Sequence, residues 1–456
     1  MGFKMKRSWI LMLLLSSLLI LTSCGGGGGG GDDDDGDGNN FSKLASMNIT
    51  DAKSIFIRSG SGSANSVSMG SSYKASGNSS SSRLFKINSS DVVEEISFFD
   101  KNHNKITLNN YGMELVPVFL EKINEEYIAV GFADSWAATQ NSLWLQSAII
   151  ARKSDGAIFL LKNIPDCNSI NNYFGGYIKT GGLFKADNAG NIYYVNQQTN
   201  EWVDNQNYSV RAGVTKLSVS GDKLTSTIIT PSVVDNCYFC ETDDAGNVLW
   251  RGYSQLLQEE VVRITTPEGL TKPVPNYATI WKDLDGRFHF IDGQDVKMIN
   301  PETYEIEVYG TFDVYPNNWA DHKVSLNGYT YLMAWGGIQE VYNPGASPRV
   351  IDLWLSISNI YGVACTENYY YIAGKDSSSN NFLIKVTPGG TSYSTILGNG
   401  YQIYAFTASE TEGITFNALR TLDMKKVLGK ISINGGEVTL LNTEEEMAVV
   451  DLIRLN

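Results

Sequence analysis

Two cysteines have a spacing that could support redox or metal chemistry. Cys237 and Cys240 form a Cys-x-x-Cys pair, which occurs in thiol oxidoreductases and as half of a four-cysteine zinc site. On a β-strand, however, residues three positions apart face opposite sides of the sheet, which is too far for a disulfide. No second pair completes a zinc site, and Cys167 and Cys365 stand alone. We therefore expect buried, inert thiols at all four positions.

Histidines are too few to suggest a catalytic centre. The chain has only His103, His289 and His322, and His289 alternates within an apolar strand pattern, FHFI, which favours a structural role. The sequence signatures of serine hydrolases, zinc proteases, phosphate-binding loops and dinucleotide-binding folds are absent. Carboxylates are numerous enough to leave a glycosidase-like acid pair open. We predict no catalytic residue, no metal and no cofactor, and we favour a binding protein over an enzyme.

Aromatic and acidic residues gather in three long connections between predicted strands. Residues 133–146, 164–182 and 196–212 are much longer than the corresponding connections later in the chain. Aromatic faces beside carboxylates suit sugars, peptides or a protein surface, and long loops on a rigid scaffold commonly bind ligands. The alternative is that the tryptophans fold inward and cap the strands beneath them. The candidate binding residues are Asp134, Trp136, Trp144, Tyr173, Tyr177, Trp202, Asp204 and Tyr208.

A repeated phrase identifies the elements that must position these residues. DNAGNIYYV (187–195) returns as DDAGNVLWR (243–251), and Gly286 and Gly328 precede two further apolar strands. Each phrase is followed by a strand, a turn tripeptide such as SGD, PEG or NGG, and another strand. With the strand that precedes each phrase, every unit has about four antiparallel strands. The phrase predicts strands at 54–58, 127–132, 192–195, 248–250, 288–291, 329–332, 369–374 and 413–416.

A sheet built from such a unit has two apolar faces. In IYYV (192–195), the residues that alternate to either side of the strand are all apolar. Stacking the sheets face to face and closing the stack into a ring buries both faces of every sheet. We therefore predict an all-β fold, a β-propeller of eight blades with four antiparallel strands each. Seven blades are the alternative if residues 41–110 form a separate N-terminal cap. A strand within residues 447–456 is well placed to pair with the first unit and close the ring.

One stretch carries a family resemblance. Asp187-x-x-Gly190-Asn191-Ile192-Tyr193 resembles the Asp-x-x-Gly-Asn-Ile-Tyr phrase of NHL-type and related bacterial propeller repeats. The spacing of the repeated strands agrees with these repeats over most of the chain, but the residues of the motif themselves occur in only two units. The Asn-Asn-Arg-Ile continuation of NHL repeats is absent, as are the Gly-His and Trp-Asp pairs of WD repeats. The resemblance implies the propeller fold, and a fold alone does not specify an activity.

The N-terminus has the features of an export signal. Three basic residues at positions 4, 6 and 7 precede an apolar run, Ile10 to Leu21, that is too short to span a bilayer comfortably. Leu21-Thr22-Ser23-Cys24 resembles the lipobox of bacterial lipoproteins. This resemblance implies cleavage before Cys24 and acylation of its thiol, palmitate being the expected kind of chain. An ordinary secretory signal is the alternative.

The residues after Cys24 predict a tether and thereby complete the domain plan. Residues 25–38 are only glycine and aspartate, a composition that stays solvated and flexible. Gly25 replaces the aspartate that retains enteric lipoproteins in the inner membrane, which favours the outer membrane in a Gram-negative host. The predicted domains are a signal peptide at 1–23, the lipidated cysteine and tether at 24–40, and the propeller at 41–456.

Charge and anchor together define the predicted function. A net charge of −14 repels nucleic acid and anionic lipid, so we do not expect either as a partner of the propeller. We predict a monomeric, lipid-anchored cell-envelope protein whose propeller binds a protein or glycan partner without catalysis. One alternative is a propeller lipoprotein of outer-membrane protein assembly, although that family's Ala-x-Asp-x-x-Thr-Gly signal is absent. The other is an enzyme that acts on a polysaccharide or glycoconjugate.

Overall fold

The computed structural model is built from β-strands throughout the residues it describes. These residues are 40–58, 83–107, 115–134, 145–162, 184–202, 208–229, 236–254, 259–275, 279–317, 320, 322–334, 337–343, 345–353, 355–441 and 449–455. All regular elements within them are strands, in agreement with the lack of helical periodicity in the sequence. No helix in this part of the chain is long and apolar enough to cross a membrane.

The repeating unit is a four-stranded antiparallel sheet, and β20 to β23 show it most clearly. β20 (Ile280–Lys282), β21 (Phe288–Asp292), β22 (Asp295–Ile299) and β23 (Ile306–Thr311) pair in chain order. The first four residues of β21 are all buried, which confirms that both faces of the strand are covered. Gly293, in the left-handed region with φ 65°, forms the short turn into β22. The apolar run FHFI therefore forms the centre of a sheet that is packed on both sides.

Four more sheets of the described chain follow the same plan. Their bounds are β16 (Asn236–Thr242), β17 (Val248–Ser254), β18 (Glu259–Thr265) and β19 (Thr271–Val274); β24 (His322–Leu326), β25 (Tyr329–Ala334), β26 (Gly337–Tyr342) and β27 (Arg349–Ile351); β28 (Ile357–Cys365), β29 (Tyr370–Asp376), β30 (Asn381–Val386) and β31 (Tyr393–Leu397); β32 (Tyr401–Ser409), β33 (Gly413–Arg420), β34 (Lys425–Ile431) and β35 (Thr439–Leu440). Every strand predicted from the repeated phrase coincides with an observed strand, and only the strand predicted at 369–374 begins one residue before its counterpart, β29.

Two further sheets have additional strands on their outer edges. β8 (Leu115–Lys122), β9 (Tyr127–Asp134), β10 (Leu145–Arg152) and β11 (Ala157–Lys162) are joined by β2 (Ala45–Met47), β6 (Phe98–Phe99) and β7 (Lys105–Ile106). β12 (Phe184–Ala186), β13 (Ile192–Trp202), β14 (Tyr208–Ser220) and β15 (Lys223–Ile228) are joined by β1 (Asn40–Ser42). The added strands all come from the N-terminal part of the described chain.

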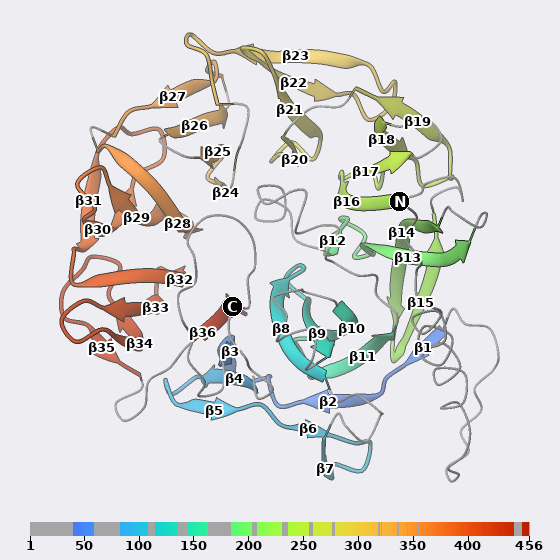
Figure 1. Cartoon of the computed structure of the whole chain (residues 1–456), viewed down its shortest axis with the longest axis horizontal. Helices are drawn as coiled ribbons and strands as arrows, with labels where there is room; N and C mark the ends of the chain where they lie inside the picture. Colours follow the sequence, from blue (N-terminus) through green and yellow to red (C-terminus); the bar gives the residue numbers. More distant parts are fainter. Residues whose placement is uncertain are drawn as a thin grey trace, which may run out of the picture. The chain divides into compact units, whose positions relative to one another are not determined.

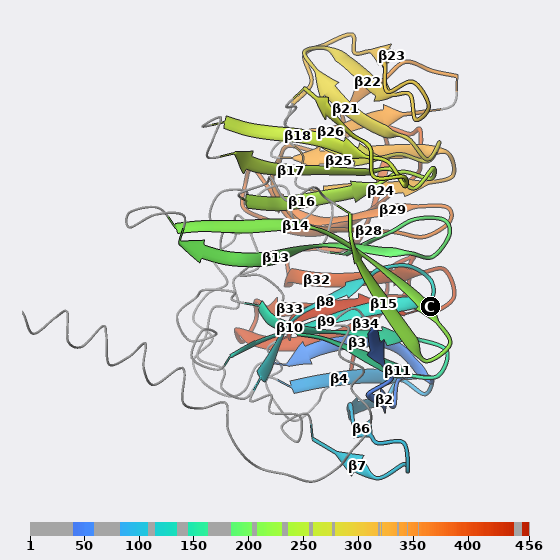
Figure 2. The ribbon, with the colours of Figure 1, turned by 90° about the vertical axis from the view of Figure 1, so that its right-hand side faces the viewer.

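The C-terminus completes the remaining sheet and closes the ring. β36 (Val449–Arg454) pairs with β3 (Ala52–Arg58), which continues into β4 (Arg83–Asn88) and β5 (Val93–Glu95). The register places Leu452 opposite Phe56. The eight sheets of the described chain thus stand around a common centre in Figure 1 and stack edge-on in Figure 2. The predicted fold class, an all-β propeller of four-stranded units, and its closure by the C-terminal strand are both confirmed.

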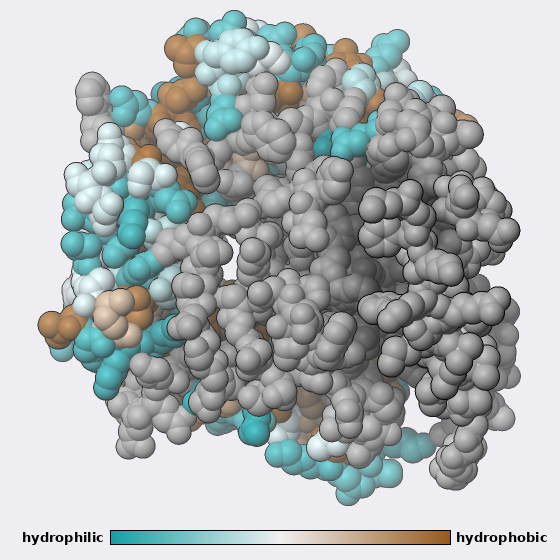
Figure 3. Space-filling view, in the orientation of Figure 1, coloured by the Kyte–Doolittle hydropathy of each residue, from teal (hydrophilic) through white to brown (hydrophobic). Residues whose placement is uncertain are grey.

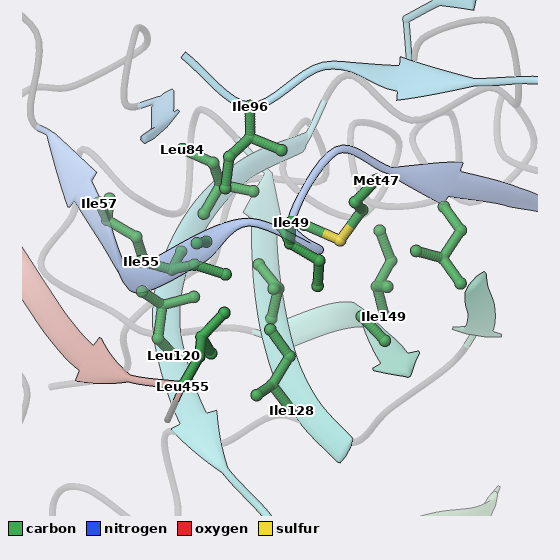
Figure 4. Close-up of a cluster of buried hydrophobic side chains, with 14 of the residues drawn as sticks. Met47, Ile49, Ile55, Ile57, Leu84, Ile96, Leu120, Ile128, Ile149 and Leu455 are labelled. Atoms are coloured by element: carbon green, nitrogen blue, oxygen red, sulfur yellow. The ribbon is translucent and has the colours of Figure 1, made fainter. Parts of the chain in front are cut away.

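The hydrophobic core lies between neighbouring sheets. Figure 4 shows the cluster where the sheet of β36 and β3 to β5 packs against the sheet of β8 to β11. Ile55 and Ile57 of β3 meet Leu120 of β8 and Ile128 of β9, and all four side chains are buried. Burying aliphatic side chains between sheets contributes roughly 1.5–3 kcal/mol each, which makes such junctions the main source of stability.

The repeated phrase forms a turn in which an aspartate, a glycine and an asparagine each have a defined role. Asp187 accepts hydrogen bonds from the backbone and side chain of Asn191 at 2.9 and 2.7 Å, and Asp243 accepts the same pair from Asn247 at 2.8 Å each. The glycine before each asparagine has φ 81°, a conformation that other residues rarely adopt. The two clearest copies of the repeated phrase therefore form the same Asp-closed, glycine-containing turn before the second strand of their sheets.

Candidate functional site

The β13–β14 hairpin is the best-described part of the predicted binding sector. The sequence predicted a long loop at 196–212, and this prediction is wrong. The two strands stay paired from Asn196 opposite Gly213 to Trp202 opposite Tyr208, with one bulge between Gln197 and Thr199. Continued backbone pairing, with β-branched and aromatic residues at several positions, outweighs the low strand preference of the Asn and Gln residues. Figure 2 shows the hairpin reaching past the ends of β16 and β17.

The candidate residues divide between this hairpin, β9 and the chain outside the described residues. Trp202 ends β13 and Tyr208 begins β14, so they are register partners at the end of the paired region. Asp134 ends β9, opposite Leu115 of β8. The remaining candidates, Trp136, Trp144, Tyr173, Tyr177 and Asp204, lie outside the described residues, as do connection 164–182 and Cys24. The structure brings Trp202 and Tyr208 together in one hairpin, and the rest of the predicted sector stays a prediction.

Charged side chains occupy the innermost strands of several sheets, a feature that the sequence analysis missed. Figure 1 shows β8, β12, β16 and β24 on the inner side of the ring. Lys185 of β12 lies 3.5 Å from Glu241 of β16, and both side chains are largely buried. Lys323 of β24 donates from Nζ to the carbonyl of Lys282 at 2.8 Å, and burial lowers the pKa of its ammonium group. Lys185 and Glu241 neutralise each other, and the ammonium group of Lys323 is bonded to a backbone carbonyl. These groups therefore form a polar lining and do not bring a nucleophile and a base into contact.

A second group of charges lies where the last sheet of the chain meets the first. Lys53 contacts Asp91 at 3.1 Å and Glu412 at 2.7 Å, and Lys430 contacts the same carboxylates at 2.8 and 3.3 Å. The hydrogen bond from Lys53 lowers the pKa of Glu412. Burial opposes ionisation of Asp91, but the bonds from Lys430 and Lys53 outweigh it and lower its pKa. Four alternating charges close to one another act as a structural clamp between β3–β5 and β32–β35.

His289 is fully buried and held by a carboxylate, as its place in an apolar strand indicated. Its Nε2 lies 3.0 Å from both carboxylate oxygens of Asp285. The ring packs against Trp281, Tyr309 and Tyr342, with ring centroids 5.5 to 6.0 Å away. A histidine without solvent access cannot exchange protons with a substrate, so this pair orders the junction between two sheets. Among the described residues, no three His, Cys, Asp or Glu side chains could jointly hold a metal ion.

The structure describes two cysteine side chains, and the predicted burial holds for Cys240, whereas Cys365 is only partly buried. Cys240 is buried and unbridged, and burial raises the pKa of its thiol to about 12; burial also raises the pKa of Cys365. Protonated thiols are poor nucleophiles. A bulge follows Cys237 in β16, so the cross-strand partners of Cys237 and Cys240 are Gly252 and Trp250. Because these partners are only two residues apart, simple alternation does not hold through the Cys-x-x-Cys pair.

Comparisons with known proteins show a likeness of fold alone. No family model matches the chain, and no curated protein does. Matching solved structures include the β-propeller domain of the trilobed protease from Pyrococcus furiosus (10% identity, 72% of this chain and 98% of that chain, TM-score 0.41). A putative 6-phosphogluconolactonase from Bacteroides fragilis matches at 12% identity over 68% of this chain and 93% of its own, with a TM-score of 0.39. An acylaminoacyl peptidase from Pyrococcus horikoshii matches at 11% identity, over 71% of this chain and 52% of its own, with a TM-score of 0.39.

Proposed function

We propose that this chain is a lipid-anchored binding module of the cell envelope, which holds a protein or glycan partner without catalysing a reaction. The observation that carries the proposal is the β13–β14 hairpin. Its strands have 11 and 13 residues, whereas no other described strand exceeds nine. A paired ribbon is pre-organised, so ordering it on binding costs less conformational entropy than ordering a loop. Aromatic residues at its end, Trp202 and Tyr208, are of the types that dominate binding interfaces.

The described polar groups support binding over catalysis. His289 is enclosed by aromatic rings and held by Asp285, and the thiol of Cys240 is protonated and buried. Lys185 and Glu241 already neutralise each other. These side chains are buried or largely buried, and those of His289, Lys185 and Glu241 are already engaged by protein partners, which favours a structural role over contact with a substrate.

The envelope location rests on the sequence of the first 40 residues. A lipid on Cys24 and a glycine–aspartate tether would hold the propeller at a membrane surface, and we propose the outer membrane. Replacing Cys24 with alanine should move the protein from the membrane fraction to the soluble fraction and abolish labelling by an alkyne fatty acid. A Cys24→Ala protein that still pellets with membranes after a high-salt wash would contradict the anchor.

The binding role is tested on the hairpin itself. We expect Trp202→Ala with Tyr208→Ala, in the full-length protein, to reduce capture of purified envelope glycans or of cross-linked envelope proteins by tenfold or more. Loss of an interface aromatic typically costs about 2 kcal/mol or more. The matched control is Tyr393→Ala, because Tyr393 is 37% exposed on β31, in another sheet.

Three outcomes would contradict the proposal. Undiminished capture by the double variant would remove the hairpin from the binding surface. A melting temperature that falls together with capture would show that the aromatic residues are structural caps. Turnover of an envelope glycan by the wild-type protein would favour the enzyme alternative.

A further inference from the structure

The outer edges of the sheets differ in how they are protected against pairing with other strands. β15 is covered by β1, and β11 is covered by β2. β5 and β27 have three residues each and β35 has two, which leaves little edge to pair with. β19 carries Pro273, which lacks a backbone donor. Short strands, proline and covering segments are the usual devices that prevent edge-to-edge association.

β23 has none of these three devices within the described chain, and neither has β31 (Tyr393–Leu397); β23 is the longer of the two, with a bulge at Tyr309 that leaves Ile306–Val308 as its regular part. It has six residues, contains no proline, and has no strand on its outer side in the described sheet order. The side chains of Ile306 and Val308, two positions apart in this strand, are both exposed, that of Val308 by 57%. Val314 and Tyr315 follow directly and are exposed as well, Tyr315 by 71%. Figure 3 shows hydrophobic residues among hydrophilic ones on the part of the rim where β23 and β27 lie.

The edge strand and the residues that flank it in the chain carry only acidic charge, whereas the neighbouring strands supply two lysines: Lys297 of β22, opposite Val308 and paired with Asp292, and Lys272 of β19, over the ring of Tyr304. Residues 302–315 contain three glutamates and one aspartate but no lysine or arginine. Glu302, Glu305 and Asp313 are exposed, and Glu307 is held by the side-chain amide of Asn300 at 3.0 Å. Lysine often protects an edge strand, and β23 itself has none; Lys297, opposite Val308 on β22, is engaged by Asp292. The edge therefore offers alternating aliphatic side chains within a negative field.

We infer that the outer edge of β23 is a docking site for an extended peptide segment of a partner protein, one whose residues alternate between aliphatic and basic. The chain itself shows this mode of pairing, because β1 and β2 add to the outer edges of β15 and β11 as extra antiparallel strands. Charge selects a basic partner, since two copies of this acidic edge would repel each other. The site belongs to the sheet of β20–β23 and is separate from the β13–β14 hairpin, so either proposal can fail without the other.

The probe is a fluorescein-labelled octapeptide, Ser-Lys-Val-Lys-Ile-Lys-Val-Ser, titrated with the full-length protein and followed by fluorescence anisotropy. We expect saturable binding that Val308→Asp weakens at least tenfold. This substitution adds negative charge while it removes the aliphatic contact, so it separates strand docking from general attraction to an acidic protein. The matched control is Ile228→Asp, because Ile228 is 55% exposed on β15, whose edge carries β1.

A second peptide tests the backbone pairing. Methylating alternate backbone nitrogens keeps the side chains and charges but removes the hydrogen bonds of an added strand, and we expect it to abolish saturable binding. The inference is overturned if the unmodified peptide does not bind, if Val308→Asp binds it as tightly as wild type, or if the methylated peptide binds equally well. A wild-type dimer that Val308→Asp dissociates would make a second copy the occupant and would also overturn it. Unchanged melting temperatures of both variants show that the fold is intact.

Discussion

The sheets formed by residues 236–441 and those formed by residues 40–228 are built differently. In the first region, each sheet consists of four strands that follow one another in the chain. In the second, sheets take strands from distant segments: β36 joins β3, β1 joins β15, and β2 joins β11. The local repeat suffices to build a sheet in the first region. In the second region, the sheets are complete only when the N-terminal and C-terminal segments have paired with them.

The contacts between neighbouring sheets differ in the same way. In the regular region, side chains and backbone of one turn bond to the next, as in the bond from the Asp244 amide to the Gly286 carbonyl at 2.8 Å. Thr330 likewise donates to Asp283 at 2.5 Å. In the other region, the N-terminal segment crosses between sheets: Lys43 donates to Asp222, Leu44 to Ile158 and Met47 to Gly156. In the regular region, bonds between repeated turns connect neighbouring sheets. In the other region, residues 43–47, which we call the strap, make these connections.

Removing the borrowed C-terminal strand should have the largest effect. Deleting residues 447–456 exposes one edge of β3 and breaks the bond from the Leu120 amide to Asp451, 2.8 Å long, which joins two sheets. We expect aggregation, or a melting temperature lower by about 10 °C or more. Deleting residues 40–42 is the control, because that sheet keeps its own four strands and should lose much less. Equal melting of the truncated and full-length proteins would show that the ring closes elsewhere.

Gly156 tests the strap. It lies in the turn between β10 and β11 with φ 70°, and a Cβ there would lie 2.0 Å from the carbonyl oxygen of Met47 in β2. Gly156→Ala should therefore lower the free energy of unfolding by about 2–4 kcal/mol, since backbone strain and displacement of β2 add together. Gly221→Ala is the matched control: the turn is equivalent and φ is 61°, but no atom lies within 4 Å of the added Cβ. Equal losses in urea unfolding would mean that β2 moves freely.

Asp243 tests the repeated turn of the regular region. Its buried carboxylate accepts two hydrogen bonds from Asn247, and burial raises its pKa. Asp243→Ala should cost about 2–3 kcal/mol in thermal or urea unfolding, because it leaves buried donors without an acceptor. Asp376→Ala removes the same two bonds from Asn380 in an exposed turn, where water replaces them, and should cost less. Equal losses would show that burial of the turn does not matter.

Asp451 gives the smallest effect, visible as a dependence on pH. Burial raises the pKa of its carboxyl group to about 6, from an ordinary value of 3.8. The folded state therefore binds a proton more tightly than the unfolded state, so this contribution to stability is full below about pH 4 and is lost as pH rises through about 6. Wild type should lose about 2 kcal/mol between pH 4 and pH 8 relative to Asp451→Asn. Parallel stability profiles of the two proteins, measured by urea unfolding between pH 4 and 8, would contradict the assignment.

Sequence reasoning succeeded where one strand depends on its immediate neighbours in the chain. The phrase around Asp187 and Asp243 predicted the turn, the apolar strand after it and the two-sided burial of that strand. It failed for β1, β2, β6 and β7, because strands of two or three residues have no readable periodicity. It also misjudged residues 196–212, where cross-strand pairing extends a hairpin whose polar residues resemble a loop.

The amino-acid sequence by itself determined the kind of sheet, the turn that begins it and the need for a ring, since apolar residues on both faces of a strand require neighbours on both sides. Only the tertiary structure decided which distant groups meet. Lys53, Asp91, Glu412 and Lys430 form one charge cluster although up to 377 positions separate them, and Lys185 meets Glu241 on adjacent inner strands. The edge of β23 is likewise a feature of the tertiary structure, because it is exposed only where no other strand of the described chain pairs with it. Local pattern dictates local pairing, whereas contacts between sheets depend on the closure of the whole ring.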